Sequence, residues 1–391
     1  MTVPIVRVDP AFPEILRAPD KQALWVSVAT ADRTVHATLD VFPRADGPLV
    51  HAPPDSAIAV AVAARGLRVS ADGVAADVRA GAPAGPPAAV FDVSPGGELV
   101  AAGGADGVLA IVDRAGRERV RTEAHAIYVA RVRFFPSGQV VLTAGGDMQI
   151  KLWDALSGDC ARAFRGHRRA VTDIAMVGRG RNFVSVSADG TVRVWECSTA
   201  KTVFAAARPP GTATDAAATH VAVLERPGPA HPAPAGLPAG LAAFGAALPT
   251  EPPVPCDREN EFEIEGKLAA VAYDDGTVAV LDLHARAWLC TAAGAPATGL
   301  AAAGTRLAVA RGRAVAVWDS ADGAVADFAV AADVLDLATD GARLAVAVPD
   351  GAFVAAPGGA VDFYAAGLPR CTAAVLRSAV YFGGPDGICR Y

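Results

Sequence analysis

VARVRFFPSGQVVLTAGGDMQIKLWD (residues 129–154) and VTDIAMVGRGRNFVSVSADGTVRVWE (residues 171–196) are neighbouring stretches that follow one plan. Each has a β-rich run, a turn with glycine, a second β-rich run, a tight turn with aspartate, and a third run that ends in tryptophan and an acidic residue. Three short strands joined by turns form an antiparallel meander, because a βαβ unit would need a helical segment between strands. The chain is therefore expected to consist of repeated antiparallel sheets.

The tight turn before the third run recurs along the chain and measures the repeat. Its positions are Asp106-Gly107, Asp147, Asp189-Gly190, Asp275-Gly276, Gly312, Asp350-Gly351 and Asp386-Gly387. Successive turns are 41, 42, 86, 37, 38 and 36 residues apart. All but one of these spacings are close to the roughly 40–45 residues of a four-stranded propeller blade. Seven turns predict an all-β chain, a seven-bladed β-propeller of the WD40 type.

The one long spacing holds a Pro-, Ala- and Gly-rich stretch, residues 227–255. Its nine prolines exclude it from a paired central strand, because proline cannot donate to the sheet. We expect a disordered surface insertion within one blade.

The two ends of the chain are expected to meet. The chain stops at ICRY (residues 388–391), which leaves the last blade one strand short. We expect a segment within residues 71–85 to supply the missing strand, most simply GVAADVR at 73–79, since such closure hides strand edges. Residues 1–70 lie outside the repeat, and their alternating run at 25–42 predicts a small β-rich N-terminal domain packed on the propeller, residues 71–391.

Composition narrows the class of function. Lys and Arg total 35 against 41 Asp and Glu, and this acidic balance argues against nucleic-acid binding. No apolar run of about 18 residues predicts a membrane span, and the start resembles no secretory signal. The six cysteines are scattered, which favours reduced thiols in the cytoplasm or nucleus over a zinc site or disulfides. We expect no cofactor or metal, and a monomeric chain.

One polar set in the second stretch has two interpretations. His167, Asp189 and a serine, Ser187 or Ser185, are residue types that can form a hydrolase triad. In a repeat, the same residues and the indole N–H of Trp195 can form one buried hydrogen-bonded chain. We favour this structural role.

The preceding repeat supports that interpretation. It has His125, Asp147 and Trp153 in matching places, but Gly145 where the serine is expected. A repeated set with a missing member fits a scaffold better than catalysis, so no enzymatic activity is expected. Trp153, Trp195 and Trp318 are predicted to be buried residues of third strands.

Charge is concentrated in two blocks. Residues 121–181 contain ten Lys and Arg against five acidic residues, whereas residues 251–265 contain six acidic residues against one Arg. Such charges can steer a protein partner and raise its association rate. The loops that precede first strands carry the densest positive charge, so the candidate protein-binding residues are Arg131, Arg165, Arg168 and Arg169. The acidic block is the second candidate.

Three segments carry a family resemblance. RFFPSG at 133–138 and GRGRN at 178–182, where an ordinary repeat has a Ser-Pro-Asp-Gly-like turn, are more specific than the general WD40 signature. With VYFGGPDGICRY at 380–391, they resemble the proteasomal ATPase-associated factor 1 family, the WD40 chaperones for assembly of the proteasome regulatory particle.

The resemblance is strongest over residues 125–200 and weaker from there to the end. It implies that the chain binds the C-terminal domain of an ATPase subunit of the 19S regulatory-particle base and holds it until assembly proceeds. WD40 propellers also serve as substrate-recognition or scaffold subunits of ubiquitin ligases and of translation or RNA-processing complexes. That alternative stays open.

Overall fold

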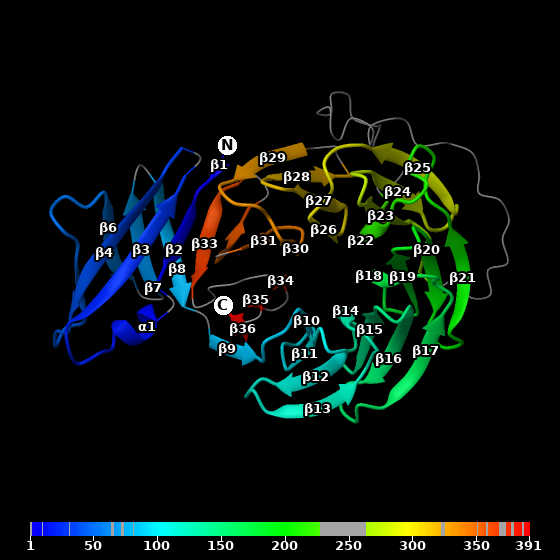
Figure 1. Cartoon of the computed structure of the whole chain (residues 1–391), viewed down its shortest axis with the longest axis horizontal. Helices are drawn as coiled ribbons and strands as arrows, with labels where there is room; N and C mark the ends of the chain where they lie inside the picture. The colour runs from blue at the N-terminus through cyan, green and yellow to red at the C-terminus, as the bar shows by residue number, and fades with distance from the viewer. Residues whose placement is uncertain are drawn as a thin grey trace.

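The chain folds almost entirely into β-strands (Figure 1). A computed structural model describes residues 2–9, 11–30, 32–63, 66–71, 74–80, 82–226, 263–321, 325–349, 351–356, 359–366, 373–376, 379–384 and 387–391. Within these ranges the single α-helix is the short α1 (Phe12–Ile15), and no helix is long and apolar enough to cross a membrane. The predicted all-β propeller class is confirmed.

Outside the N-terminal domain, the described strands form seven groups of four antiparallel strands that pair in order, and those of blades 5 and 6 are parts of a five-stranded and a seven-stranded sheet. Blade 1 contains β10 (Val90–Val93), β11 (Leu99–Gly103), β12 (Val108–Asp113) and β13 (Glu118–Glu123); blade 2 contains β14 (Val129–Phe134), β15 (Val140–Gly145), β16 (Gln149–Asp154) and β17 (Cys160–Arg165); blade 3 contains β18 (Val171–Val177), β19 (Asn182–Ser187), β20 (Val192–Glu196) and β21 (Lys201–Ala206); blade 4 contains β22 (Ala218–Glu225), β23 (Lys267–Tyr273), β24 (Val278–Asp282) and β25 (Ala287–Ala292). Blade 5 contains β26 (Gly299–Ala303), β27 (Arg306–Arg311), β28 (Ala314–Asp319) and β29 (Val325–Val330); blade 6 contains β30 (Asp336–Thr339), β31 (Leu344–Val348), β32 (Gly351–Ala355) and β33 (Val361–Ala366); blade 7 contains β34 (Ala373–Leu376), β35 (Val380–Gly384), β36 (Gly387–Arg390) and β9 (Ala82–Gly85).

The first strands of successive blades contact one another and close a ring, since β34 also contacts β10 (Figure 1). Among the described residues the sheets give seven four-stranded units around this ring.

The repeated aspartate shapes the turn before the third strand in blades 1 to 4. Its carboxylate accepts the backbone N–H two residues further on, which closes an Asx turn. These bonds measure 3.1, 3.2, 2.8 and 2.8 Å at Asp106, Asp147, Asp189 and Asp275. The turn residues Asp350 and Asp386 lie outside the described part of the chain.

The strand that closes the ring is not the predicted one. β9 pairs antiparallel with β36, with Gly85 opposite Ile388, whereas β8 (Val74–Ala80) pairs with β7 (Gly66–Ala71) and, in parallel, with β33. The assignment of residues 73–79 to blade 7 is therefore wrong, and the closing strand is the last part of the 71–85 segment. β8 follows β7 after a short connection, and closing a short loop costs less entropy than pairing with a distant strand.

The N-terminal domain extends to residue 80, so the boundary predicted at residue 70 falls too early. Its sheets consist of β2 (Ile5–Val8), β3 (Gln22–Ala29), β4 (Thr34–Phe42) and β5 (Leu49–His51), and of β6 (Ile58–Ala63), β7 and β8. β1 (Thr2–Val3) pairs in parallel with β29. The domain shares one hydrophobic core with blades 5 and 6, where the hydroxyl of Tyr364 donates to the carbonyl of Pro4 at 2.7 Å.

The segment predicted to be a disordered insertion, residues 227–255, lies outside the described residues. The residues beside it are anchored. Arg226 pairs with Asp282 at 2.6 Å, and Glu263 accepts the backbone N–H of Arg179 at 2.6 Å.

Buried carboxylates tie neighbouring blades together around the central channel. Asp92 in blade 1 accepts the backbone N–H of Phe134 in blade 2 at 2.7 Å. Asp173 in blade 3 accepts the N–H of Val221 in blade 4 at 3.0 Å and pairs with Arg131 of blade 2 at 3.0 Å. Both aspartates are 1% exposed, so these bonds form away from water, where an unmade bond is most costly.

Replacing Asp92 with alanine is expected to lower the free energy of unfolding by about 1–3 kcal/mol, because the buried N–H of Phe134 loses its acceptor. Urea denaturation followed by circular dichroism measures this loss. Asp92→Asn keeps an acceptor oxygen and should lose less. Asp46→Ala, at an exposed position, serves as the control. Equal stability of Asp92→Ala and the unmodified chain would contradict the role given to this cross-blade bond.

Candidate functional site

A chain of hydrogen bonds crosses blade 3. The Nε2 atom of His167 lies 2.7 Å from the hydroxyl of Ser185, which also accepts the indole N–H of Trp195 at 2.8 Å. On the other side of the imidazole, Nδ1 lies 3.2 Å from the carboxylate of Asp189. Because a carboxylate only accepts, Nδ1 carries the proton and the Ser185 hydroxyl donates to Nε2. The bonds join the loop before β18 to β19, β20 and the turn between them.

Of the two serines that the sequence left open, Ser185 belongs to this chain of hydrogen bonds and Ser187 does not. Trp195 is paired with Phe183, so Ser185 is its neighbour two residues along the same face. Ser187 lies four residues along, roughly 13 Å at 3.3 Å per residue, too far for the indole. Its hydroxyl donates instead to the carbonyl of Arg169 at 3.1 Å and accepts the N–H of Asp189 at 3.1 Å.

Blade 2 contains the same chain with a threonine. The hydroxyl of Thr143 lies 2.8 Å from Nε2 of His125 and accepts the indole N–H of Trp153 at 2.9 Å. Nδ1 of His125 lies 2.8 Å from Asp147. The hydrogen-bonded chain of blade 2 is therefore complete, and the interpretation that Gly145 marks a missing member is wrong. Gly145 matches Ser187, and a Cβ added there would lie 2.3 Å from the His125 ring.

Trp318 occupies the third strand of blade 5 and is 8% exposed. It pairs with Leu307, so the position that bears the hydroxyl in blades 2 and 3 is Val309 here. Trp318 packs with both residues in an apolar cluster. Blade 5 thus has the third-strand tryptophan, but an apolar residue stands where blades 2 and 3 have the hydroxyl.

Burial and hydrogen bonds shift the pKa values of the chain members. Burial lowers the pKa of His125, and the bond to Asp147 only partly opposes this shift. Burial raises the pKa of Asp189, but bonds from His167, the N–H of Arg168 and Thr191 outweigh burial and hold this pKa below its usual range. A neutral His125 and a charged Asp189 are therefore favoured in the folded state.

The hydroxyls of Ser185 and Thr143 are inaccessible. Both residues are 0% exposed, and each hydroxyl is held by a histidine and a tryptophan. A nucleophile has to contact its substrate, so this geometry favours the structural role. The described residues also hold no group of three or more His, Cys, Asp or Glu that could bind a metal ion.

The four arginines predicted to bind a partner do not form one patch. Arg131 lies on β14 in the central channel, in a cavity of about 280 Å³, where it pairs with the buried Asp173. Its placement on the rim was wrong because it lies within the strand and not in the preceding loop.

The other three arginines lie on one rim of the propeller. This rim, here the Asp-turn rim, consists of the loops that precede first strands and the turns between second and third strands. Arg165 donates to the side chain of Gln149 at 3.3 Å, and Arg169 donates to the carbonyl of Ala188 at 2.9 Å. Arg168 is exposed beside them, and none of the three forms an ion pair with a described residue.

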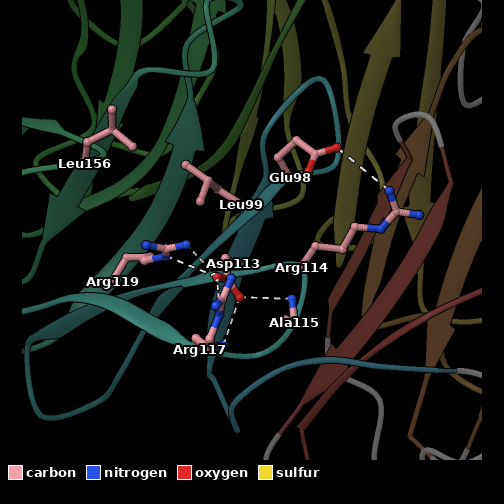
Figure 2. A pocket seen from close by; sticks show the side chains of 8 residues that line it. All are labelled: Glu98, Leu99, Asp113, Arg114, Ala115, Arg117, Arg119 and Leu156. Atoms are coloured by element: carbon pink, nitrogen blue, oxygen red, sulfur yellow. Dashed lines mark hydrogen bonds and ion pairs between the residues drawn. The ribbon is translucent and has the colours of Figure 1, made fainter.

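The opposite rim has a cavity of about 560 Å³ between blades 1 and 2 (Figure 2). Its arginines are paired, in contrast to those of the Asp-turn rim. Arg117 and Arg119 both contact Asp113 at 2.9 Å, and Arg114 lies 3.8 Å from Glu98. Positive charge is largely neutralised in this cavity, so the Asp-turn rim is the stronger candidate for binding an acidic partner.

Comparisons with known proteins agree with the repeat. The WD domain, G-beta repeat family matches residues 117–154 and 158–196. The 26S proteasome regulatory subunit RPN14 of Saccharomyces cerevisiae is 40% identical over 86 residues, which cover 22% of this chain and 21% of the relative. Periodic tryptophan protein 2 of Arabidopsis thaliana is 32% identical over 77 residues (20% and 9%), and Pre-mRNA-processing factor 17 of Mus musculus is 38% identical over 82 residues (20% and 14%). The matched part is about a fifth or less of each relative.

Replacing Ser185 with alanine is expected to lower the free energy of unfolding by about 2–4 kcal/mol, because it leaves both the Trp195 indole and the His167 ring without a partner. Guanidinium denaturation monitored by tryptophan fluorescence measures the change. Ser185→Thr is the matched control, since blade 2 uses Thr143 at this place, and it should recover most of the loss. A Thr variant as unstable as the Ala variant would contradict a role for the hydroxyl.

The stability of the chain is expected to decrease as the pH falls below about 6.5. The folded pKa of His125 lies below its ordinary value of 6.5, so the unfolded chain takes up a proton first. Protonation then favours unfolding until the folded pKa is reached. Denaturation at pH 7, 6 and 5 measures the slope, which His125→Asn should reduce. An unchanged slope in this variant would exclude His125 as the titrating group.

Proposed function

We propose that this WD40 scaffold protein acts as an assembly chaperone for the proteasome 19S regulatory-particle base by binding the C-terminal domain of an ATPase subunit. The observation that carries the proposal is the match to the yeast proteasome regulatory subunit, which is 40% identical over 86 residues. The RFFPSG and GRGRN segments, which the general repeat lacks, support it further.

The molecule has the physical properties that such a role requires. Buried hydrogen-bonded chains fix the loops of blades 2 and 3, so a partner meets a preorganised surface and less conformational entropy is lost on binding. The three exposed arginines of the Asp-turn rim, which form no ion pair with a described residue, would attract an acidic partner surface. In this proposal the protein is a monomer in the cytoplasm and nucleus. It catalyses no reaction and binds neither nucleic acid nor membranes.

A second candidate is a scaffold or substrate-recognition subunit of another complex, such as a ubiquitin ligase or a translation or RNA-processing complex. The partial match to a pre-mRNA-processing factor favours this candidate. Both candidates use the same rigid platform and differ only in the partner.

The purified chain is expected to bind the isolated C-terminal domain of one regulatory-particle ATPase subunit and to leave the mature proteolytic core unbound. Surface plasmon resonance with each domain in turn measures this binding. Arg168→Glu combined with Arg169→Glu should slow association and flatten its dependence on salt, with little loss of stability, because both side chains are exposed.

Failure of every ATPase domain to bind would contradict the chaperone proposal. Capture of RNA-processing or ubiquitin-ligase subunits from lysate under the same conditions would then favour the second candidate. Binding that the double Glu variant leaves unchanged would place the interface away from these arginines.

A further inference from the structure

One turn of the Asp-turn rim departs from the others. The residue after the turn aspartate is glycine in blades 1, 3 and 4, with φ of 80° at Gly107, 78° at Gly190 and 88° at Gly276. In blade 2 the same place is occupied by Met148, with φ of 65°. A side chain in this left-handed region clashes with the following carbonyl, which is why glycine is the usual choice.

No hydrophobic packing among the described residues explains this methionine. Its side chain is 44% exposed and belongs to none of the hydrophobic clusters of the described residues. A residue that breaks a local conformational preference without a packing reward is expected at functional positions.

Two further exposed apolar residues lie in the loop that is joined to the Met148 turn. Ile127 is 54% exposed and Tyr128 is 38% exposed, both in the loop before β14. The Tyr128 ring lies over Gly146, where an added Cβ would come within 2.5 Å of it, and the Tyr128 carbonyl accepts the N–H of Gly146 at 3.0 Å. The loop and the turn are also joined by the N–H of Ala126, which donates to Asp147 at 3.2 Å.

Positive charge borders these residues. Met148 is followed by Gln149, which pairs with Arg165 at the end of β17, and Arg168 and Arg169 follow in the next loop. The nearest aspartates, Asp147 and Asp189, have side chains only 7% and 8% exposed and are held by the two histidines. Glu123 and Asp106, in the adjoining loop and turn, are exposed acidic residues. The three exposed arginines outnumber these two, so the exposed charge on this part of the rim is positive on balance.

We propose that Ile127, Tyr128 and Met148, with Arg165, Arg168 and Arg169 beside them, form a docking site, the Met148 surface, for an amphipathic helix with an acidic polar face. The proposal deepens the function given above and rests on it only for the identity of the partner. An unbranched, flexible methionine and an aromatic ring can adapt to the apolar face of a helix, and the arginines complement its carboxylates.

The backbone of this surface favours a helix over an added strand. The N–H groups of His125, Ala126 and Val129 are already bonded to Gly107, Asp147 and Gly104. Strand addition needs a free row of backbone donors and acceptors, whereas a helix uses side chains alone.

The test uses the full chain and a synthetic 20-residue helical peptide with leucines on one face and glutamates elsewhere, together with a scrambled peptide of the same composition. Fluorescence anisotropy is expected to show salt-dependent binding of the amphipathic peptide and at least about tenfold weaker binding of the scrambled one. Met148→Gly should weaken binding of the amphipathic peptide about tenfold.

The same Met148→Gly variant should melt at an unchanged temperature or about 1–2 °C higher, because glycine relieves the backbone strain at this φ. A merely structural methionine would shift stability and leave binding alone. Leu156→Ser, at a 70% exposed leucine on the opposite rim, is the matched control and should bind like the unmodified chain.

Equal binding of the peptide by Met148→Gly and the unmodified chain would overturn the proposal, as would equal binding of the scrambled peptide. A chain that dimerises, and that Met148→Gly converts to a monomer in sedimentation, would overturn it too, because a second copy would then cover the surface. Met148-dependent peptide binding without binding of any ATPase domain would sustain the Met148 surface and reject the chaperone role. Normal binding of an ATPase domain to the Met148→Gly variant would support the chaperone role and reject the Met148 surface.

Discussion

The pairing of β9 with β36 closes the propeller, and the rest of the fold depends on it. It brings residues 82–85, which precede blade 1, into blade 7, so the two ends of the ring are held by one sheet. The N-terminal domain adds two parallel pairings, β1 with β29 and β8 with β33, which cover the outer edges of blades 5 and 6. An uncovered edge would offer unpaired backbone groups to other chains, so these two parallel pairings protect blades 5 and 6 while β9 closes the ring.

This arrangement makes the ring asymmetric. The N-terminal domain lies beside blades 5 and 6, while blades 2 and 3 lie on the other side of the ring (Figure 1). The polar chains of His125 and His167 occur in those two blades, where they fix the loops that carry the exposed arginines. These hydrogen-bonded chains thus support loops on the side of the ring away from the N-terminal domain (Figure 1).

The spacing of the turn aspartates was sufficient to predict the architecture, because an Asx turn binds its own backbone and needs no distant partner. The predictions that were wrong concern residues whose place or role is set by a partner far away in the sequence. Ser185 and Ser187 share a face of β19, and only the register against Trp195 selects Ser185. Arg131 belongs to the channel because Asp173, in the next blade, binds it.

The closing strand and the Met148 surface were missed for different reasons. β9 has the sequence APAG, which has low strand propensity, and it becomes a strand because blade 7 has a vacant edge. Met148 could have been noticed, since the sequence has Asp-Gly at most of the repeated turns and Asp-Met at this one.

The repeat itself makes that departure informative. Copies of one turn experience the same backbone geometry, so the glycines of blades 1, 3 and 4 show what folding alone requires at this position. A methionine at the same place keeps the left-handed conformation and adds exposed apolar area beside three arginines that form no ion pair with described residues. Among the described residues nothing covers this apolar area or forms an ion pair with these arginines, which is why we assign the surface to a partner molecule.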